Sequence, residues 1–216
     1  MKMRMNIGCG QTPTAGWNNY DNSIAVLLAN VPGVVSLARR LRLLDARQYE
    51  FAEFAGHAKI QWADGTRRIP APPGSVDVLY TSHMLEHLTR ADAVRFLRLA
   101  LTALAPGGLV RIAVPDLRHH VDAYLKDGDA EAFMRNILLG KEHAVGFVAR
   151  MKLLLLGERH HQWMYDGRSL CAMLTAVGFE DARVLPDGIT GIANPGSLDL
   201  AERSPESVFV EARRPR

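Results

Sequence analysis

Glycines and acidic or polar residues follow short apolar runs of the sequence, at points where a strand would end. Gly8-Cys9-Gly10 comes directly after an apolar run, and Asp21 closes the next extended run. Glycines let the backbone approach a bound nucleotide closely, and an acid on the neighbouring strand can accept both hydroxyl hydrogens of a ribose. A glycine pair after a strand also occurs in simple turns. The pattern predicts a nucleotide site, with an ordinary turn as the alternative.

Two further strand ends carry groups of the same kind. Asp64 follows an expected strand at residues 59–63, and Ser82-His83 follows the apolar run 76–80. In open α/β sheets, ligands bind beyond the carboxyl ends of the strands, where the strand order reverses. Asp64 could instead cap the backbone of its own loop. Four such strand ends in chain order favour one shared ligand site.

The segments that would position these groups alternate between strand-like and helix-like patterns. Strands are expected at residues 3–8, 18–21, 59–63, 76–80, 109–114, 182–185 and 207–212. Helices are expected at residues 34–54, 89–104, 116–156 and 167–177. Only thirteen positions separate Gly8 from Asp21. A crossover needs about a dozen residues or more, so we expect a turn there instead of a first helix.

Composition narrows the class of protein. The chain has 216 residues, 48% of them hydrophobic, which suits one domain with a sizeable core. Its net charge of +3 comes from scattered basic residues, which does not indicate a nucleic-acid surface. Two cysteines, Cys9 and Cys171, favour a reducing compartment. With no signal peptide or membrane span expected, we predict a cytoplasmic protein.

Taken together, these segments resemble the class I S-adenosylmethionine (SAM)-dependent methyltransferases. The similarity rests on residues 6–10, 16–21, 74–88, 104–112 and 207–212. A narrower resemblance, to short bacterial members of the methyltransferase type 11 group associated with surface glycans, rests on the short first loop and on residues 161–166 and 198–207. The resemblance implies a Rossmann-like three-layer α/β/α sandwich with a seven-stranded, mostly parallel sheet and an antiparallel last strand. It implies one domain over residues 1–216, with a helical cap at about residues 116–160.

The resemblance also implies that SAM is the cofactor. Asn6 stands where many members have an acid, and would hydrogen-bond the amino-acid end of SAM. Asp21 would hold the ribose, and Asp64 the adenine amino group. The expected cofactor-binding residues are Asn6, Gly8, Cys9, Gly10, Gln11, Asp21, Ala63, Asp64, Gly65, Ser82 and His83. Gln11 is a departure, since a third glycine is common at its position.

Methyl transfer depends mainly on aligning the acceptor with the methyl group, and such positioning can lower a barrier by about 7–11 kcal/mol. An oxygen acceptor can also need a base. We favour His83 as this base, with Asp116 and His161 as further candidates. Asp116 could instead cap the following helix, and His161 could lie in a polar turn. The expected function is transfer to a small-molecule or glycan acceptor at oxygen, and the alternative is a non-catalytic SAM- or nucleotide-binding protein.

Residues 83–87 also have the His-x-x-Glu-His spacing of inverted zinc peptidases. On a helix, His83 and His87 would lie one turn apart beside the Glu86 carboxylate. The sequence shows no evident third ligand, and the neighbouring strand ends fit SAM. We therefore predict no metal site, take His87 as a structural histidine, and keep a zinc hydrolase as the lesser alternative. Apolar residues at 145–156 could form a dimer surface, a lid or plain core.

Overall fold

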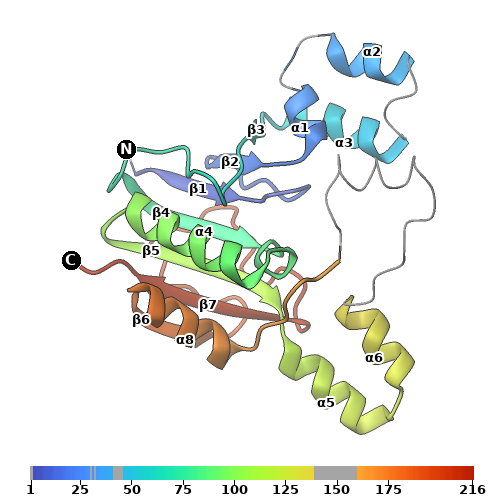
Figure 1. Ribbon diagram of the computed structural model, residues 1–216. Coiled ribbons are helices and arrows are strands. Elements are labelled where there is room, and N and C mark those ends of the chain that lie inside the picture. Colours follow the sequence, from blue (N-terminus) through green and yellow to red (C-terminus); the bar gives the residue numbers. More distant parts are fainter. Residues whose placement is uncertain (1, 30, 32, 41–45, 139–159) are drawn as a thin grey trace.

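The computed structural model describes the chain except for residues 1, 30, 32, 41–45 and 139–159. Its sheet has seven strands in the order β3-β2-β1-β4-β5-β7-β6 (Figure 1). Strand β7 runs antiparallel to both of its neighbours, and the other pairs are parallel. The strands are β1 (Arg4–Ile7), β2 (Asn18–Asp21), β3 (Gln61–Trp62), β4 (Val76–Ser82), β5 (Leu104–Pro115), β6 (Glu180–Leu185) and β7 (Ser207–Arg213).

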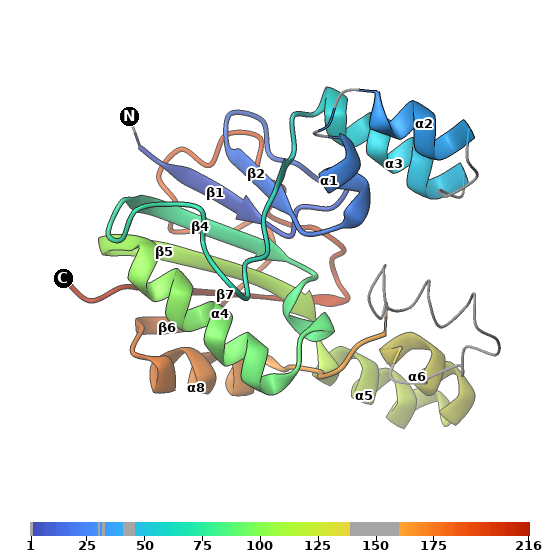
Figure 2. The same cartoon turned by 45° about the horizontal axis from the view of Figure 1, so that its top comes forward.

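The helices form three groups around this sheet. Helices α4 (Arg90–Ala103) and α8 (Gly167–Val177) lie on one face (Figure 1). The short helices α1 (Ile24–Ala29), α2 (Val34–Arg40) and α3 (Ala46–His57) gather beside β2 and β3. Helices α5 (Leu117–Asp127) and α6 (Ala130–Ile137) extend beyond the carboxyl end of β5 (Figure 2). The last two groups therefore flank the edge at which the parallel strands end.

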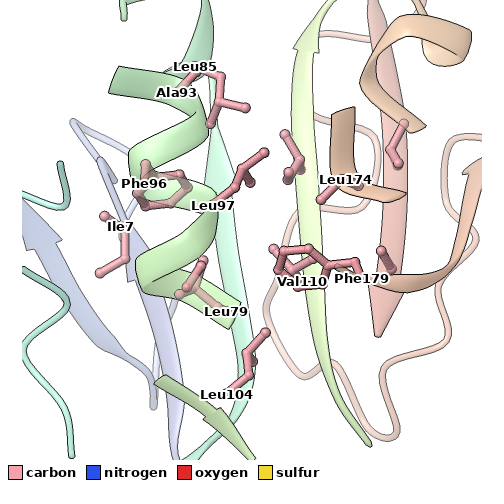
Figure 3. Packing of buried hydrophobic residues seen from close by; sticks show 14 of the residues in the cluster. Ile7, Leu79, Leu85, Ala93, Phe96, Leu97, Leu104, Val110, Leu174 and Phe179 are labelled. Carbon is pink, nitrogen blue, oxygen red and sulfur yellow. The ribbon is translucent and has the colours of Figure 1, made fainter. Parts of the chain in front are cut away.

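The main core lies between the sheet and helices α4 and α8. Ile7, Leu79, Phe96 and Val110 are each almost completely buried there (Figure 3). Gly65 is part of this packing, because a Cβ at its position would lie 2.9 Å from Ile7 Cγ2. These contacts fix the ends of β1 and β4 relative to each other.

The opposite face of β4 and β5 is covered by the long segment 186–206. Tyr80 and Leu109 pack there against Ile192 and Leu198 of that segment. Arg111 anchors it, since its guanidinium donates to the carbonyls of Ile189 at 2.9 Å and Leu200 at 3.0 Å. The chain thus covers part of this face with a pinned loop where a three-layer sandwich commonly has helices.

Several element predictions are confirmed, among them β2, α8, the turn in place of a first helix, and the antiparallel last strand. Three are corrected. Strand β5 begins at Leu104 and runs through Pro106-Gly107-Gly108, where a turn was expected, because Leu104 pairs with Val76 of β4 and Gly107 and Gly108 bond the backbone of Arg214. The predicted helix 34–54 is represented by α2 and α3, and α1 was not predicted because its six apolar residues show no period.

The predicted helical cap is only partly described. Residues 117–127 and 130–137 are the helices α5 and α6, separated by Gly128 in the left-handed conformation. The remainder of the predicted helix, together with the apolar residues 145–156, lies outside the described residues.

In the described ranges, no helix combines the length and apolar character needed to cross a membrane.

Candidate functional site

The site lies at the carboxyl ends of β1, β2 and β4. Strand β1 pairs in parallel with β2 on one side and with β4 on the other, so the strand order reverses between β1 and β4. Ligands of open α/β sheets bind at such a reversal. The four predicted strand ends, those of β1, β2, β3 and β4, therefore lie at the same edge of the sheet.

The glycine loop after β1 is fastened to the end of β2. The amides of Gly8 and Cys9 donate to the Tyr20 carbonyl at 2.8 and 3.0 Å. The Gly10 amide donates to Asp21 Oδ2 at 3.1 Å. Gly8 and Gly10 have φ of +73° and +49°, which favour glycine. The predicted pairing of the glycine loop with Asp21 is thus a direct contact.

Gly8 also lies directly against the side chain of Met84, which follows β4. A Cβ on Gly8 would lie 2.8 Å from Met84 Sδ and 2.9 Å from its Cγ. At Gly10 no heavy atom lies within 4 Å of the equivalent position. The loop is therefore tightly packed at Gly8 and open at Gly10.

Asn6 supports the same loop from beneath. Its Nδ2 donates to the Thr12 carbonyl and to Thr14 Oγ1, both at 3.2 Å. Its Oδ1 is buried and has no hydrogen-bond partner among the described residues. The ammonium of an amino acid would supply the missing donor. This acceptor and the open space at Gly10 are compatible with SAM beside the loop.

Asp21 and Asp64 differ in how many protein groups their carboxylate oxygens already bind. Asp21 Oδ1 accepts from the Ser23 amide at 2.8 Å, so each of its oxygens takes one backbone amide and keeps a further lone pair. Asp64 Oδ1 accepts from both the amide and the hydroxyl of Thr66, and its Oδ2 lies 3.2 Å from Arg67 Nε. The loop-capping role considered for Asp64 is therefore present.

Three further residues of the predicted cofactor set, Cys9, Ala63 and Gly65, could contribute only backbone atoms to a cofactor site. The Cys9 thiol is buried with Val26 and Ile60, and burial raises its pKa to about 12. Gly65 must lack a side chain because Ile7 packs where its Cβ would lie, so its being glycine does not by itself indicate a ligand. Ala63 is buried, with its amide donating to the Asp21 carbonyl at 3.1 Å, whereas Gln11 is exposed.

His83 turns the chain away from β4 and is held from both sides. It has φ of +48°, and its Nε2 lies 3.0 Å from Ser207 Oγ. Its Nδ1 lies 3.2 Å from Oε1 of Glu86, whose side chain is 1% exposed. The Nε2 of this candidate base is thus in hydrogen-bond contact with the protein, whereas its Nδ1 faces the Glu86 carboxylate without a well-formed hydrogen bond.

His161 is brought to the same cluster from a distant part of the chain. Its Nδ1 lies 2.9 Å from the Ile137 carbonyl, and its ring lies 5.0 Å from that of His87. Burial lowers the pKa of His161, so the neutral ring is favoured near pH 7. Residues 85–87 form a 3₁₀ turn and not the α-helix considered for the His-x-x-Glu-His run.

Asp116 takes the capping role considered for it. Its side chain accepts from the Arg118 amide at 3.0 Å as the N-cap of α5, and its own amide donates to the Glu206 carbonyl. These contacts give Asp116 a structural role. Ser82 is buried at the end of β4.

Glu202 is a further site residue that the sequence did not reveal. Its Oε1 accepts from Thr12 Oγ1 at 3.3 Å and its Oε2 from the Tyr80 hydroxyl at 3.0 Å. Burial and the nearby Glu202 carboxylate raise the pKa of Tyr80. Glu202 lies in the segment 186–206, and only the fold brings that segment to the glycine loop.

Comparison with known proteins gives one family match and several similar structures. The methyltransferase domain family matches residues 19–184. Among solved structures, a SAM-dependent methyltransferase from Mesorhizobium loti is 17% identical, with 98% of this chain and 90% of that chain covered and a TM-score of 0.49. One from Archaeoglobus fulgidus is 13% identical, with 98% and 86% covered and a TM-score of 0.49. No curated protein matches the chain.

The chain spans about half the length of two other similar structures. These are PigF bound to S-adenosylhomocysteine (SAH), with 13% identity, 99% of this chain and 50% of that chain covered and a TM-score of 0.47, and the methyltransferase SibL, with 51% of its chain covered.

The chain belongs to the methyltransferase domain family, because the match covers most of its length. The predicted Rossmann-like α/β fold is confirmed, and the family match agrees with the predicted class of methyltransferase. The narrower resemblance to the type 11 group stays a prediction, as do the roles of the individual site residues.

Proposed function

We propose that this chain transfers the methyl group of SAM to a hydroxyl oxygen of a small-molecule or glycan acceptor. The observation that carries the cofactor part is the bond from the Gly10 amide to Asp21 Oδ2 at the strand-order reversal. This bond joins a backbone that can approach the methionine part of SAM to a carboxylate that can accept from its ribose. Asn6 Oδ1 is the acceptor for the ammonium.

The oxygen acceptor is supported by the groups that follow β4. Transfer to a hydroxyl must release a proton, and transfer to a thioether or an amine lone pair need not do so before attack. A buried carboxylate, Glu86, with the imidazoles of His83 and His161 nearby, can stabilise the charge that changes as this proton leaves. We further infer a single domain with the region 116–160 as its acceptor-side cap, and a cytoplasmic setting.

Calorimetric titration with SAM and with SAH tests the cofactor. We expect micromolar binding of both, and loss of both in Asp21→Ala. Asp77→Ala is the matched control, because Asp77 accepts a hydrogen bond from the Met3 amide at the amino end of β4, away from the site. Equal binding by wild type and Asp21→Ala would show that the cofactor has been wrongly placed.

Release of SAH with a panel of hydroxylated acceptors tests the reaction. An enzyme releases SAH only when an acceptor is present, and the acceptor gains one methyl group. A protein that binds SAM and SAH but releases none with glycosides, phenols or simple alcohols would support the non-catalytic alternative.

A further inference from the structure

Glu86 is a buried carboxylate that lacks a well-formed hydrogen bond. Its side chain is 1% exposed, and neither oxygen has a hydrogen-bond partner of good geometry among the described residues. Two histidine nitrogens lie within 4 Å of Glu86 Oε1: His83 Nδ1 at 3.2 Å and His87 Nε2 at 3.9 Å. An uncompensated buried carboxylate is costly, so this position calls for a positive charge beside it.

Two imidazoles near Glu86 are oriented as metal ligands are. His87 Nδ1 lies 3.3 Å from the His160 carbonyl, and His161 Nδ1 lies 2.9 Å from the Ile137 carbonyl. Carbonyls only accept, so each Nδ1 carries a proton, and in the metal-binding form of the ring the lone pair is then on Nε2. Metal-binding histidines usually donate their other N–H to such an oxygen, which fixes the tautomer and the ring.

The three ligand residues lie close together in space although they are far apart in the sequence. One atom each from Glu86, His87 and His161 lies within 4.8 Å of the others. The segment after residue 160 is fastened to the turn by three bonds: the Gln162 and Trp163 amides donate to the Glu86 carbonyl at 2.6 and 3.2 Å, and Gln162 Nε2 donates to the His87 carbonyl at 3.0 Å. This fastening supplies the third ligand that the sequence did not show.

The orientation of His83 adds an independent argument for a positive charge. Ser207 Oγ donates to the Arg203 carbonyl at 3.3 Å, so it accepts from His83 Nε2–H at 3.0 Å. A neutral His83 then presents its Nδ1 lone pair to the Glu86 carboxylate at 3.2 Å. Two acceptors face each other at this distance only if a cation or a proton lies close by.

We propose that Glu86, His87 and His161 bind a divalent transition-metal ion of the Zn²⁺ and Co²⁺ type beside the methyl-transfer site. Two imidazoles and one carboxylate are the protein ligands of catalytic zinc sites that leave a position open for water or substrate. Mg²⁺ and Ca²⁺ prefer all-oxygen sites. The metal would serve methyl transfer and not peptide hydrolysis, so this inference rests on the proposed function.

A small side-chain movement would close the site. Bonds of about 2.0–2.2 Å place two tetrahedral ligands of one zinc ion about 3.4 Å apart, so no pair of these ligand atoms needs to approach by more than about 1.4 Å. The His87 side chain is 34% exposed and has room to adjust, whereas Glu86 and His161 are buried. The buried pair would define the position of the ion.

The position of the turn gives the ion a use in the reaction. Met84, two residues before Glu86, lies against Gly8 of the cofactor loop. An acceptor hydroxyl on the open position would face the methyl group, and the ion would lower the pKa of that hydroxyl. The O–H proton leaves to solvent. An oxygen electron pair then forms the O–C bond as the C–S bond breaks, with its electrons staying on sulfur, so the products are the methyl ether, SAH and one proton.

Titration of the metal-free full chain with Co²⁺, followed by visible absorption and calorimetry, tests the site. We expect one ion per chain, with the absorption bands of a site of low coordination number, and displacement by Zn²⁺. Loss of a partner that only orients a ligand costs about 10–100-fold in affinity, so Glu86→Gln and His161→Ala should each cost at least about 100-fold. His57→Ala, an exposed histidine on α3, should bind Co²⁺ as wild type does.

Two further outcomes would overturn the metal site. Wild type that binds neither Co²⁺ nor Zn²⁺ would overturn the proposal, whether or not the variants fold. Binding that Glu86→Gln and His161→Ala leave unchanged, or a preference for Mg²⁺, would also overturn it. SAM titration of the chelator-treated wild type separates the two hypotheses, because we expect SAM to bind without metal, and its failure would count against the proposed function alone.

Discussion

Arg111 and Glu211 form a fully buried ion pair on the antiparallel strands β5 and β7, with Nη1 and Oε1 2.9 Å apart. Their side chains are 0% and 2% exposed. The same guanidinium and carboxylate also bond the segment 186–206, the carboxylate through the Gly191 amide at 2.8 Å. Because Glu202 belongs to this segment, the pair holds part of the site wall against the sheet.

Removing one partner of this pair should destabilise the fold strongly. Glu211→Ala would leave the Arg111 charge buried without its partner, which costs about 3–5 kcal/mol. We expect urea unfolding to show this loss in the free energy of unfolding. Asp122→Ala, which breaks the exposed Arg118–Asp122 pair, is the control and should change the free energy of unfolding far less, because solvent screens an exposed pair. Similar losses in the two variants would contradict the role given to the buried pair.

Gly8→Ala should damage the cofactor loop more than its backbone conformation alone explains. The left-handed φ of +73° costs alanine about 1–2 kcal/mol, and Met84 must also move aside. Gly188→Ala is a close control, with the same φ of +73° and no heavy atom within 4 Å of the added Cβ.

SAM titration of both variants separates strain from crowding. We expect Gly8→Ala to lose at least about tenfold in SAM affinity, or about 1.4 kcal/mol, and Gly188→Ala to bind as wild type does. Met84→Ala in the Gly8→Ala background should restore part of the affinity by making room. If Gly188→Ala lost as much affinity as Gly8→Ala, the contact with Met84 would be irrelevant.

The sequence was sufficient for those parts of the site that local patterns determine. A short apolar run ending in Gly8 and Gly10, and a second ending in Asp21, predicted strands, their parallel pairing and the shared edge, and the Gly10–Asp21 bond follows from that topology. The capping roles considered for Asp64 and Asp116 were likewise predictable, because an acid at a loop or helix start bonds the amides that follow it.

The features that the sequence did not predict depend on contacts between distant segments of the chain. His161 meets Glu86 and His87 only because the chain returns after some 75 positions and bonds the turn through Gln162. Glu202 reaches Tyr80 across 122 positions. Neither pairing leaves a periodic signal, so the sequence did not place His161 beside Glu86 and His87. Strand β5 was predicted too short because its added residues gain their partners from Val76 of β4 and from Arg214 near the C-terminus.

The Cys9 thiol should be chemically inert in the folded protein. Burial, with a smaller effect from Asp21, raises its pKa from 9.0 to about 12, so almost no thiolate exists at pH 8. Iodoacetamide followed by peptide mass spectrometry should modify Cys9 only after urea unfolding, and the half-buried Cys171 sooner in the native state. Rapid native labelling of Cys9 would contradict its burial.

The same shift has a consequence for stability at high pH. The folded state keeps the Cys9 proton where the unfolded state loses it, so this contribution is complete below pH 9.0 and is lost as pH rises toward about 12. Cys9→Ala removes the effect. The stability difference between wild type and Cys9→Ala should therefore move in favour of the variant between pH 8 and pH 10, and a constant difference would contradict the shift.

Asp166 should stabilise helix α8 through its charge and its cap. Its carboxylate accepts from the Ser169 amide at 2.7 Å, and Ser169 Oγ accepts from the Asp166 amide in return. These bonds lower the pKa of Asp166 below 3.8. Asp166→Ala should cost about 1 kcal/mol near neutral pH, as N-cap losses do.

The pH dependence of this cost distinguishes the charge from the cap. A lowered carboxyl pKa contributes stability above pH 3.8 that is lost as pH falls through the folded value. Asp166→Asn keeps a capping oxygen without a titrating group, so the advantage of wild type over Asp166→Asn should shrink as pH is lowered from 5 toward 3. Thermal unfolding at several pH values measures this. An advantage that persists unchanged at low pH would mean that the cap, and not the charge, stabilises α8.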